Sequence, residues 1–247
     1  MAGRPALVLL HAWPLDARMW RHQVAALGGD GVVIAPNLPG FGSEPVATPS
    51  SDEWGRRLAA KLRGQGVDRA VVAGCSMGGY VALALLRVDP TLLAGIALIS
   101  ARLAGDTPVF TAARKGTIGD IERMGSSFLV FNTTLSLGPS SRKDPEIVAA
   151  IKEMVSSTKP AALIAAYRAI GARPDMTAEV AQSQVPLMVI AGTNDVTMSI
   201  DEARAICATV PRASFTEVPG AGHFSPMESP EVVTAALRDF WNAVPAS

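Results

Sequence analysis

The sequence has few features of a secreted, metal-binding or nucleic-acid-binding protein. Its two cysteines, Cys75 and Cys207, cannot build a disulfide framework or a paired-cysteine metal site, so we expect a reducing cytoplasmic setting and no metal. Lys+Arg and Asp+Glu both number 22, and no basic run occurs, which argues against nucleic acid or a membrane surface as a partner. No apolar stretch approaches a transmembrane length, and the run at residues 6–10 is too short for a signal peptide.

The sequence does have ample apolar material, arranged in short runs. Hydrophobic residues make up 49% of the 247 residues, which is enough for one sizeable α/β core. Six runs have the length of buried parallel strands: residues 6–10, 32–35, 70–73, 95–100, 187–191 and 214–218. Helical patterns separate most of these runs. We therefore predict a mostly parallel, doubly wound sheet of about six strands, flanked by helices, with functional loops at the strand C-terminal ends.

One interval breaks the alternation of strands and helices. Residues 101–184 contain no convincing strand, and four helical patterns follow one another there: 107–116, 119–131, 145–157 and 160–171. Such a long excursion between strands is more often a functional lid than a set of ordinary surface helices. We therefore predict an α/β core made of residues 1–100 and 185–247, with residues 101–184 inserted as a helical cap.

Residues 70–87 contain the strongest motif. A short apolar run meets Gly74-Cys-Ser-Met-Gly78, and helix-forming residues follow. In the pattern Gly-x-Ser-x-Gly the serine sits at the apex of a strained strand-to-helix turn, and larger residues at the two glycines would collide with neighbouring backbone. An ordinary glycine-rich turn is the alternative, but the strand-turn-helix context favours Ser76 as a nucleophile.

A nucleophilic serine needs a base, and the chain has only three histidines. His22 lies among polar residues in a helical pattern, and His11 follows the first strand, where we favour a structural role. His223 follows the last strand in a glycine-rich loop that could fold back toward Ser76. We predict His223 as the general base.

The third group should be a carboxylate that fixes the tautomer of the imidazole. Asp195 lies just past the strand at 187–191, and the order Ser76, Asp195, His223 is the one expected for such an elbow. Asp106, which follows the fourth strand, is the one serious alternative.

Two backbone N–H groups are expected to bind the oxyanion. One belongs to Met77, directly after the nucleophile, and the other to Trp13, in the turn after the first strand. We expect the substrate pocket to include Ala12, Tyr80, Met124 and Phe128. For Tyr80 and Met124, packing in the core is an equally good explanation.

Five segments together resemble the α/β-hydrolase superfamily: residues 11–16, 37–43, 74–79, 192–195 and 220–223. The resemblance covers essentially the whole chain and is greatest to small bacterial esterases, 3-oxoadipate enol-lactonases and cofactor-free haloperoxidases. It implies an α/β-hydrolase fold with a helical cap and no metal or organic cofactor. Two departures stand out, because Ala12 replaces the usual glycine and Asn37 the usual aspartate. The methyl group of Ala12 would narrow the space beside the oxyanion turn, and we interpret the charge lost at Asn37 as structural.

From these features we predict a serine hydrolase that cleaves an ester, lactone or thioester of a small apolar substrate through an acyl-enzyme. The predicted cap is rich in apolar side chains, and the sequence does not place a cation where it would obviously hold a carboxylate. Arg102 and Arg168 are the two arginines that could serve as such an anchor. Perhydrolase, lyase or other biosynthetic chemistry on the same site is an alternative, and so is a ligand receptor with little turnover. The sequence is compatible with a homo-oligomer but does not indicate the oligomeric state.

Overall fold

The computed structural model describes residues 4–210 and 212–245. Within them, six strands form a single sheet in the order β2-β1-β3-β4-β5-β6, and every neighbouring pair is parallel. The strands are β1 (Ala6–Leu10), β2 (Val33–Ile34), β3 (Ala70–Cys75), β4 (Leu93–Ile99), β5 (Leu187–Gly192) and β6 (Ala213–Val218). Each predicted strand is confirmed to within a few residues. Short apolar runs mark the four central strands because these are covered on both faces, whereas the edge strands β2 and β6 are only partly buried.

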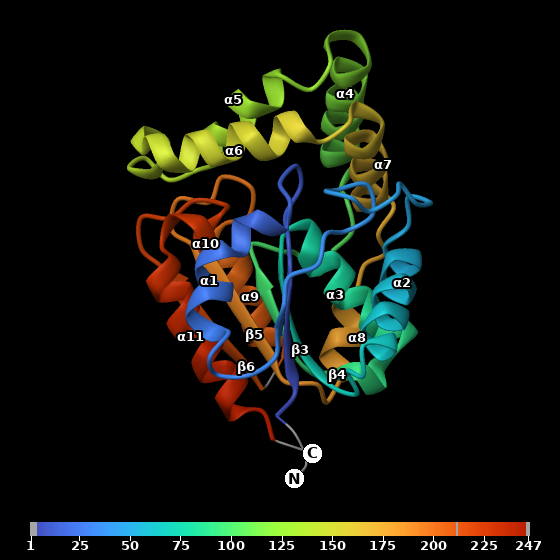
Figure 1. The fold of residues 1–247 in the computed structure, drawn as a ribbon, viewed down its shortest axis with the longest axis vertical. Helices are drawn as coiled ribbons and strands as arrows, with labels where there is room; N and C mark the ends of the chain where they lie inside the picture. The colour runs from blue at the N-terminus through green and yellow to red at the C-terminus, as the bar shows by residue number, and fades with distance from the viewer. Residues whose placement is uncertain (1–3, 211, 246–247) are drawn as a thin grey trace.

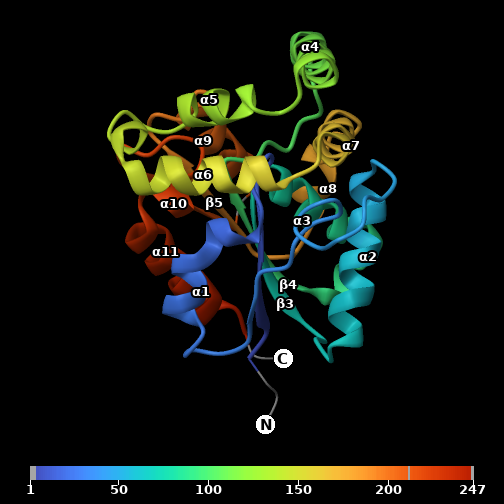
Figure 2. The same cartoon turned by 45° about the horizontal axis from the view of Figure 1, so that its top comes forward.

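Helices cover both faces of this sheet (Figures 1 and 2). The flanking helices are α1 (Arg21–Leu27), α2 (Ser51–Gly64), α3 (Met77–Val88), α9 (Ile200–Thr209), α10 (Ser225–Glu228) and α11 (Pro230–Ala243). Helices α1 and α11 pack together on one side, while α2 and α3 pack together on the other. Every residue of β1, β3, β4 and β5 is buried, so the core lies around the central strands.

The chain between β4 and β5 is helical, as predicted. It contains α4 (Pro108–Met124), α5 (Phe128–Leu135), α6 (Pro145–Ser157), α7 (Pro160–Gly171) and the short α8 (Thr177–Gln182). In Figure 1, α4 to α7 lie beyond the end of the sheet, whereas α8 lies lower, beside its flank. None of the helices in the described parts of the chain is both long and apolar enough to span a membrane.

Two of the four helices expected in this interval have different bounds. The break predicted near residue 117 does not occur, because Gly116 and Gly119 both remain helical inside α4. The helix ends at Met124 and is followed by Gly125, which adopts a φ of +75° that side-chain-bearing residues rarely adopt. The predictions for α6 and α7 agree with the structure.

Candidate active site

Ser76 lies at a tight turn between β3 and α3. Its φ of 50° and ψ of −111° are strained for a residue with a side chain. A Cβ atom on Gly74 would lie 2.2 Å from the backbone of Gly78, and one on Gly78 would lie 2.2 Å from the carbonyl oxygen of Leu10. No side chain fits at either glycine, so the strand and helix meet closely enough to hold Ser76 at the apex of the turn.

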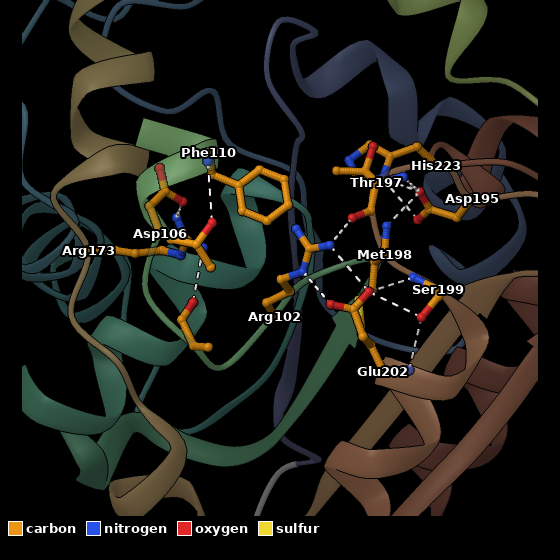
Figure 3. A network of polar contacts seen from close by, with 12 residues as sticks. Arg102, Asp106, Phe110, Arg173, Asp195, Thr197, Met198, Ser199, Glu202 and His223 are labelled. Carbon is orange, nitrogen blue, oxygen red and sulfur yellow. Dashed lines mark hydrogen bonds and ion pairs between the residues drawn. The ribbon is translucent and has the colours of Figure 1, made fainter. Parts of the chain in front are cut away.

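His223 and Asp195 form a buried pair at the C-terminal edge of the sheet (Figure 3). The imidazole Nδ1 lies 2.9 Å from Oδ2 and 3.1 Å from Oδ1 of the Asp195 carboxylate. The backbone N–H groups of Thr197 and Met198 donate to the same carboxylate at 2.7 and 3.1 Å. The Asp195 side chain has no exposed surface, and that of His223 is 7% exposed. The two residues expected to act as acid and base are therefore in direct contact.

The charge on Asp195 decides which nitrogen of His223 carries the proton. Burial alone would raise the pKa of Asp195, but the His223 ring and the Thr197 N–H outweigh it and hold this pKa below its ordinary value. Asp195 is therefore ionised at neutral pH and accepts the hydrogen bond from Nδ1–H. In this tautomer the Nε2 atom is free to accept a proton.

Asp106, the alternative acid, has other partners. Its carboxylate pairs with Arg114 at 2.7 Å and with Arg173 at 2.6 Å, and its side chain is only 3% exposed. It makes no hydrogen bond to His223, whereas Asp195 makes two close contacts. The geometry thus favours Asp195 as the partner of the histidine.

Met77 and Trp13, whose N–H groups are the expected oxyanion donors, lie directly after Ser76 and in the wall of the cavity that includes Ser76. Met77 is the first residue of α3, where the N–H groups lack helical partners. Neither N–H donates to an acceptor within residues 4–210 and 212–245. The Trp13 side chain stacks on Tyr167 with ring centroids 4.0 Å apart and donates from Nε1 to the Leu163 carbonyl oxygen at 3.1 Å. This contact with α7 holds the turn after β1 in place.

His11 holds the same turn from inside the core. Its Nε2 accepts a hydrogen bond from the Leu38 N–H at 2.9 Å, and burial lowers its pKa to about 4. His11 is therefore neutral and joins the turn to residues 37–43, which agrees with the structural role favoured from the sequence. Asn37 is structural as well, because its side-chain oxygen accepts the Ala17 N–H at 2.9 Å.

A cavity of about 330 Å³ contains the candidate nucleophile and base. Its lining includes Ser76, His223, aromatic side chains and several polar groups. Of the four residues expected in the pocket, Tyr80 lies in this lining, whereas Ala12, Met124 and Phe128 do not. Among the described residues, no group of three His, Cys, Asp or Glu side chains is arranged to hold a metal ion.

Ala12, Met124 and Phe128 lie outside the cavity lining for three different physical reasons. Ala12 is fully buried, and its N–H donates to the Met19 sulfur at 3.2 Å, so its methyl group does not reach the cavity. Met124 lies at the last turn of α4 and is 58% exposed. Phe128 begins α5 and packs against buried residues instead.

The lining is less apolar than predicted, because three arginines reach it. Arg102, Arg114 and Arg173 all line the cavity together with Asp106. Arg168, the other cation singled out from the sequence, is 57% exposed and pairs with Glu122 at 3.6 Å. Arg114 and Arg173 were not expected in the pocket, because they come from α4 and from the segment after α7 and meet only in the folded chain.

Glu228 is a further residue that the sequence did not indicate. One of its carboxylate oxygens accepts the N–H groups of Gly138 at 2.7 Å and Gly222 at 2.9 Å, and the other accepts the Phe224 N–H at 2.9 Å. The His223 N–H donates to the Ser136 carbonyl oxygen at 2.8 Å. Glu228 thus fixes the histidine loop against the loop that follows α5.

Comparison with known proteins identifies the family of this chain. A family model described as the alpha/beta hydrolase family matches residues 7–236. A thermophilic esterase from Thermogutta terrifontis, solved with malate bound, is 33% identical, with a TM-score of 0.92 over 97% of this chain and 90% of that chain. A pimeloyl-[acyl-carrier protein] methyl ester esterase from Aromatoleum aromaticum is 29% identical over 250 residues, which cover 96% of this chain and 98% of that protein.

The fold extends to more distant structures. The enol-lactonase from Burkholderia xenovorans superposes with a TM-score of 0.88 at 23% identity, over 97% of this chain and 92% of that chain, which shows a shared fold. The family model spans nearly the whole chain, and the six parallel strands with flanking helices form the α/β-hydrolase fold. The chain therefore belongs to the alpha/beta hydrolase family and is an enzyme of the hydrolase class.

Proposed function

We propose that this enzyme cleaves a carboxylic ester, lactone or thioester through an acyl-enzyme formed on Ser76. His223 Nε2 takes the proton from the Ser76 hydroxyl as its oxygen attacks the carbonyl carbon. The N–H groups of Met77 and Trp13 stabilise the negative charge that develops on the carbonyl oxygen. Collapse of the tetrahedral intermediate breaks the bond to the leaving group, which receives the proton from His223.

The second half of the reaction uses the same groups. His223 removes a proton from water, and the resulting hydroxide attacks the acyl carbon. The bond to the Ser76 oxygen then breaks, the serine recovers its proton from His223, and the carboxylic acid leaves. Asp195 stays ionised throughout and stabilises the imidazolium that forms in each half.

The placement of Ser76, His223 and Asp195 is the main support for this mechanism. The buried Asp195–His223 pair and the strained Ser76 turn come from distant parts of the chain, yet Ser76 and His223 line one cavity. The strain at Ser76 and the burial of the Asp195 carboxylate both cost stability, and such costs are typical of functional sites. The names of the relatives, which are esterases, support ester cleavage in particular.

The cavity supports a small substrate. Its volume of about 330 Å³ is at the lower end of the range for small-molecule sites. Trp13, Tyr167 and Phe110 form an aromatic part of the lining. Burial against these rings would contribute roughly 25 cal/mol per Å² of apolar substrate surface. We therefore expect part of the substrate to be apolar.

Replacement of the nucleophile tests the proposal. We expect Ser76→Ala to lower kcat on p-nitrophenyl esters and lactones by about 10³-fold or more while the fold is retained. Ser156→Ala is the matched control, because Ser156 is an exposed serine on α6. Unchanged turnover by a folded Ser76→Ala protein would refute the mechanism, and absence of turnover by the wild type on the whole panel would favour a receptor.

A further inference from the structure

Two guanidinium groups and one carboxylate form a compact cluster in the cavity wall. Arg114 donates from Nε to Oδ2 of Asp106 at 2.7 Å and from Nη2 to Oδ1 at 3.1 Å. Arg173 donates from Nη1 to Oδ1 of Asp106 at 2.6 Å. Since two cations share one anion, the cluster itself carries one net positive charge. The nearby Asp175 carboxylate also feels the charge of Arg173, but in the described chain the two arginines form ion pairs only with Asp106. All three residues line the cavity that contains Ser76.

The surrounding residues hold both arginines in place. The Arg114 guanidinium lies 4.3 Å from the ring centre of Tyr167, and that of Arg173 lies 4.1 Å from the ring centre of Tyr80. Arg173 also donates to the carbonyl oxygens of Ile170 at 2.8 Å and Ala104 at 3.0 Å. Arginines that are fixed before a ligand arrives lose little side-chain entropy when they bind it.

Some donors in the cluster are unused. Nη1 of Arg114 donates to none of residues 4–210 and 212–245, and the Arg114 side chain is 14% exposed. Nε of Arg173 is buried and also lacks an acceptor in the described chain, although the side chain is only 5% exposed. A buried donor without an acceptor is costly, and few are seen in folded proteins. Of the two unused donors only Nη1 of Arg114 is on a partly exposed side chain, so that atom, together with the net positive charge, is the one suited to an anion in the cavity.

The other cations are less suited to this role. Arg102 donates to both carboxylate oxygens of Glu202, at 3.0 and 3.2 Å, and to the Thr197 carbonyl oxygen. Figure 3 shows Arg102 between the His223–Asp195 pair and the Asp106–Arg173 pair, with its guanidinium turned toward Thr197 and Glu202. Its charge is thus balanced.

We propose that Arg114, backed by Arg173, binds a carboxylate of the substrate, so that the enzyme cleaves a half-ester or half-thioester of a dicarboxylic acid. This inference rests on the proposed function and names its substrate class. The carboxylate lies at the Arg114 end of the cavity, the ester carbonyl lies at Ser76, and the apolar chain between them contacts Trp13 and Tyr167. Asp106 keeps the two guanidinium groups together. Because it neutralises one of their two positive charges, the cluster has charge left for one substrate carboxylate.

Matched pairs of substrates test the inference. Monomethyl esters of linear dicarboxylic acids with four to eight carbons are compared with methyl esters of monocarboxylic acids of the same length. Methanol release is followed at pH 7.5, where the free carboxyl group is ionised. We expect at least one acid ester to exceed its neutral partner in kcat/KM by about 10-fold or more.

The variants assign that preference to a residue. Arg114→Gln should lower kcat/KM for the acid ester by about 10- to 100-fold more than kcat/KM for the neutral ester of the same length. Arg114→Lys keeps the charge without the planar fork, and it should retain part of the preference. Arg168→Gln, an exposed arginine outside the cavity lining, is the control and should change neither substrate.

Binding separates this inference from the proposed mechanism. The preferred acid ester is titrated calorimetrically into Ser76→Ala and into Ser76→Ala with Arg114→Gln, and we expect about 10-fold or more weaker binding by the double variant. Cleavage of neutral esters without any preference for acid esters, or a preference that survives Arg114→Gln, would overturn the carboxylate site alone. Carboxylate binding that depends on Arg114 without ester cleavage would instead refute the proposed mechanism.

Discussion

Acid should destabilise this protein through His11, which is fully buried and neutral in the folded state. Burial lowers its pKa to about 4, whereas an imidazole in the unfolded chain has a pKa of about 6.5. Between these two values the unfolded state binds a proton that the folded state does not. Stability therefore rises with pH across this window, is fully present above about pH 6.5, and is lost as the pH falls toward 4.

The size of the effect follows from the two pKa values. The full difference of two and a half units corresponds to about 3 kcal/mol, because one unit is about 1.4 kcal/mol. At pH 4.5 the folded state has begun to bind the proton, so the loss relative to pH 7.5 is about 2.5 kcal/mol. This loss adds to whatever the carboxylates contribute over the same range, and a variant without the imidazole isolates it.

Urea unfolding of wild type and His11→Gln at pH 7.5 and pH 4.5 measures this contribution. The Gln side chain can present its oxygen to the Leu38 N–H that His11 Nε2 accepts, but it does not titrate. We expect the pH-dependent loss of unfolding free energy to be about 2.5 kcal/mol smaller in His11→Gln than in wild type. His22→Gln, at an exposed histidine on α1, is the control. Equal pH dependence in wild type and His11→Gln would refute the assignment of His11 as a buried neutral group.

Two further predictions concern the histidine and its supports. Asp195→Asn should lower kcat by about 10⁴-fold, because the amide favours the wrong tautomer of His223, and ester hydrolysis at near wild-type rates would contradict this role. Glu228→Gln keeps the shape of the side chain but replaces one of the oxygens that accept three backbone N–H groups with a donor. We expect it to lose about 1.5–3 kcal/mol of unfolding free energy and to lower kcat, and unchanged values of both would show that Glu228 does not position the histidine loop.

The parts of the site that sequence could predict are those attached to strand ends. Gly74 and Gly78 identify the elbow because their lack of side chains is a local steric requirement. Asp195 and His223 could be paired in advance because parallel strands bring their C-terminal ends to one edge of the sheet. The order of the strands is sufficient to place these residues, whatever the orientation of the helices between β4 and β5.

The rest of the pocket depends on that orientation. Met124 was expected in the pocket as part of an apolar helix, but the face of α4 that turns inward carries Arg114. The cluster of Arg114, Arg173 and Asp106 joins residues separated by up to 67 positions, and no periodic pattern connects them. Charged pairs of this kind are set by tertiary packing, which explains why the pocket appeared more apolar in the sequence than it is in the structure.

Covalent labelling tests the central claim most directly. A fluorophosphonate reacts with an activated serine and leaves a phosphonyl group attached to its oxygen, which intact-mass measurement and peptide mapping locate. The mechanism predicts one phosphonyl group per chain, carried by Ser76, and no labelling of Ser76→Ala under the same conditions. Labelling at another serine, or no labelling of an active wild-type enzyme, would contradict a nucleophilic Ser76.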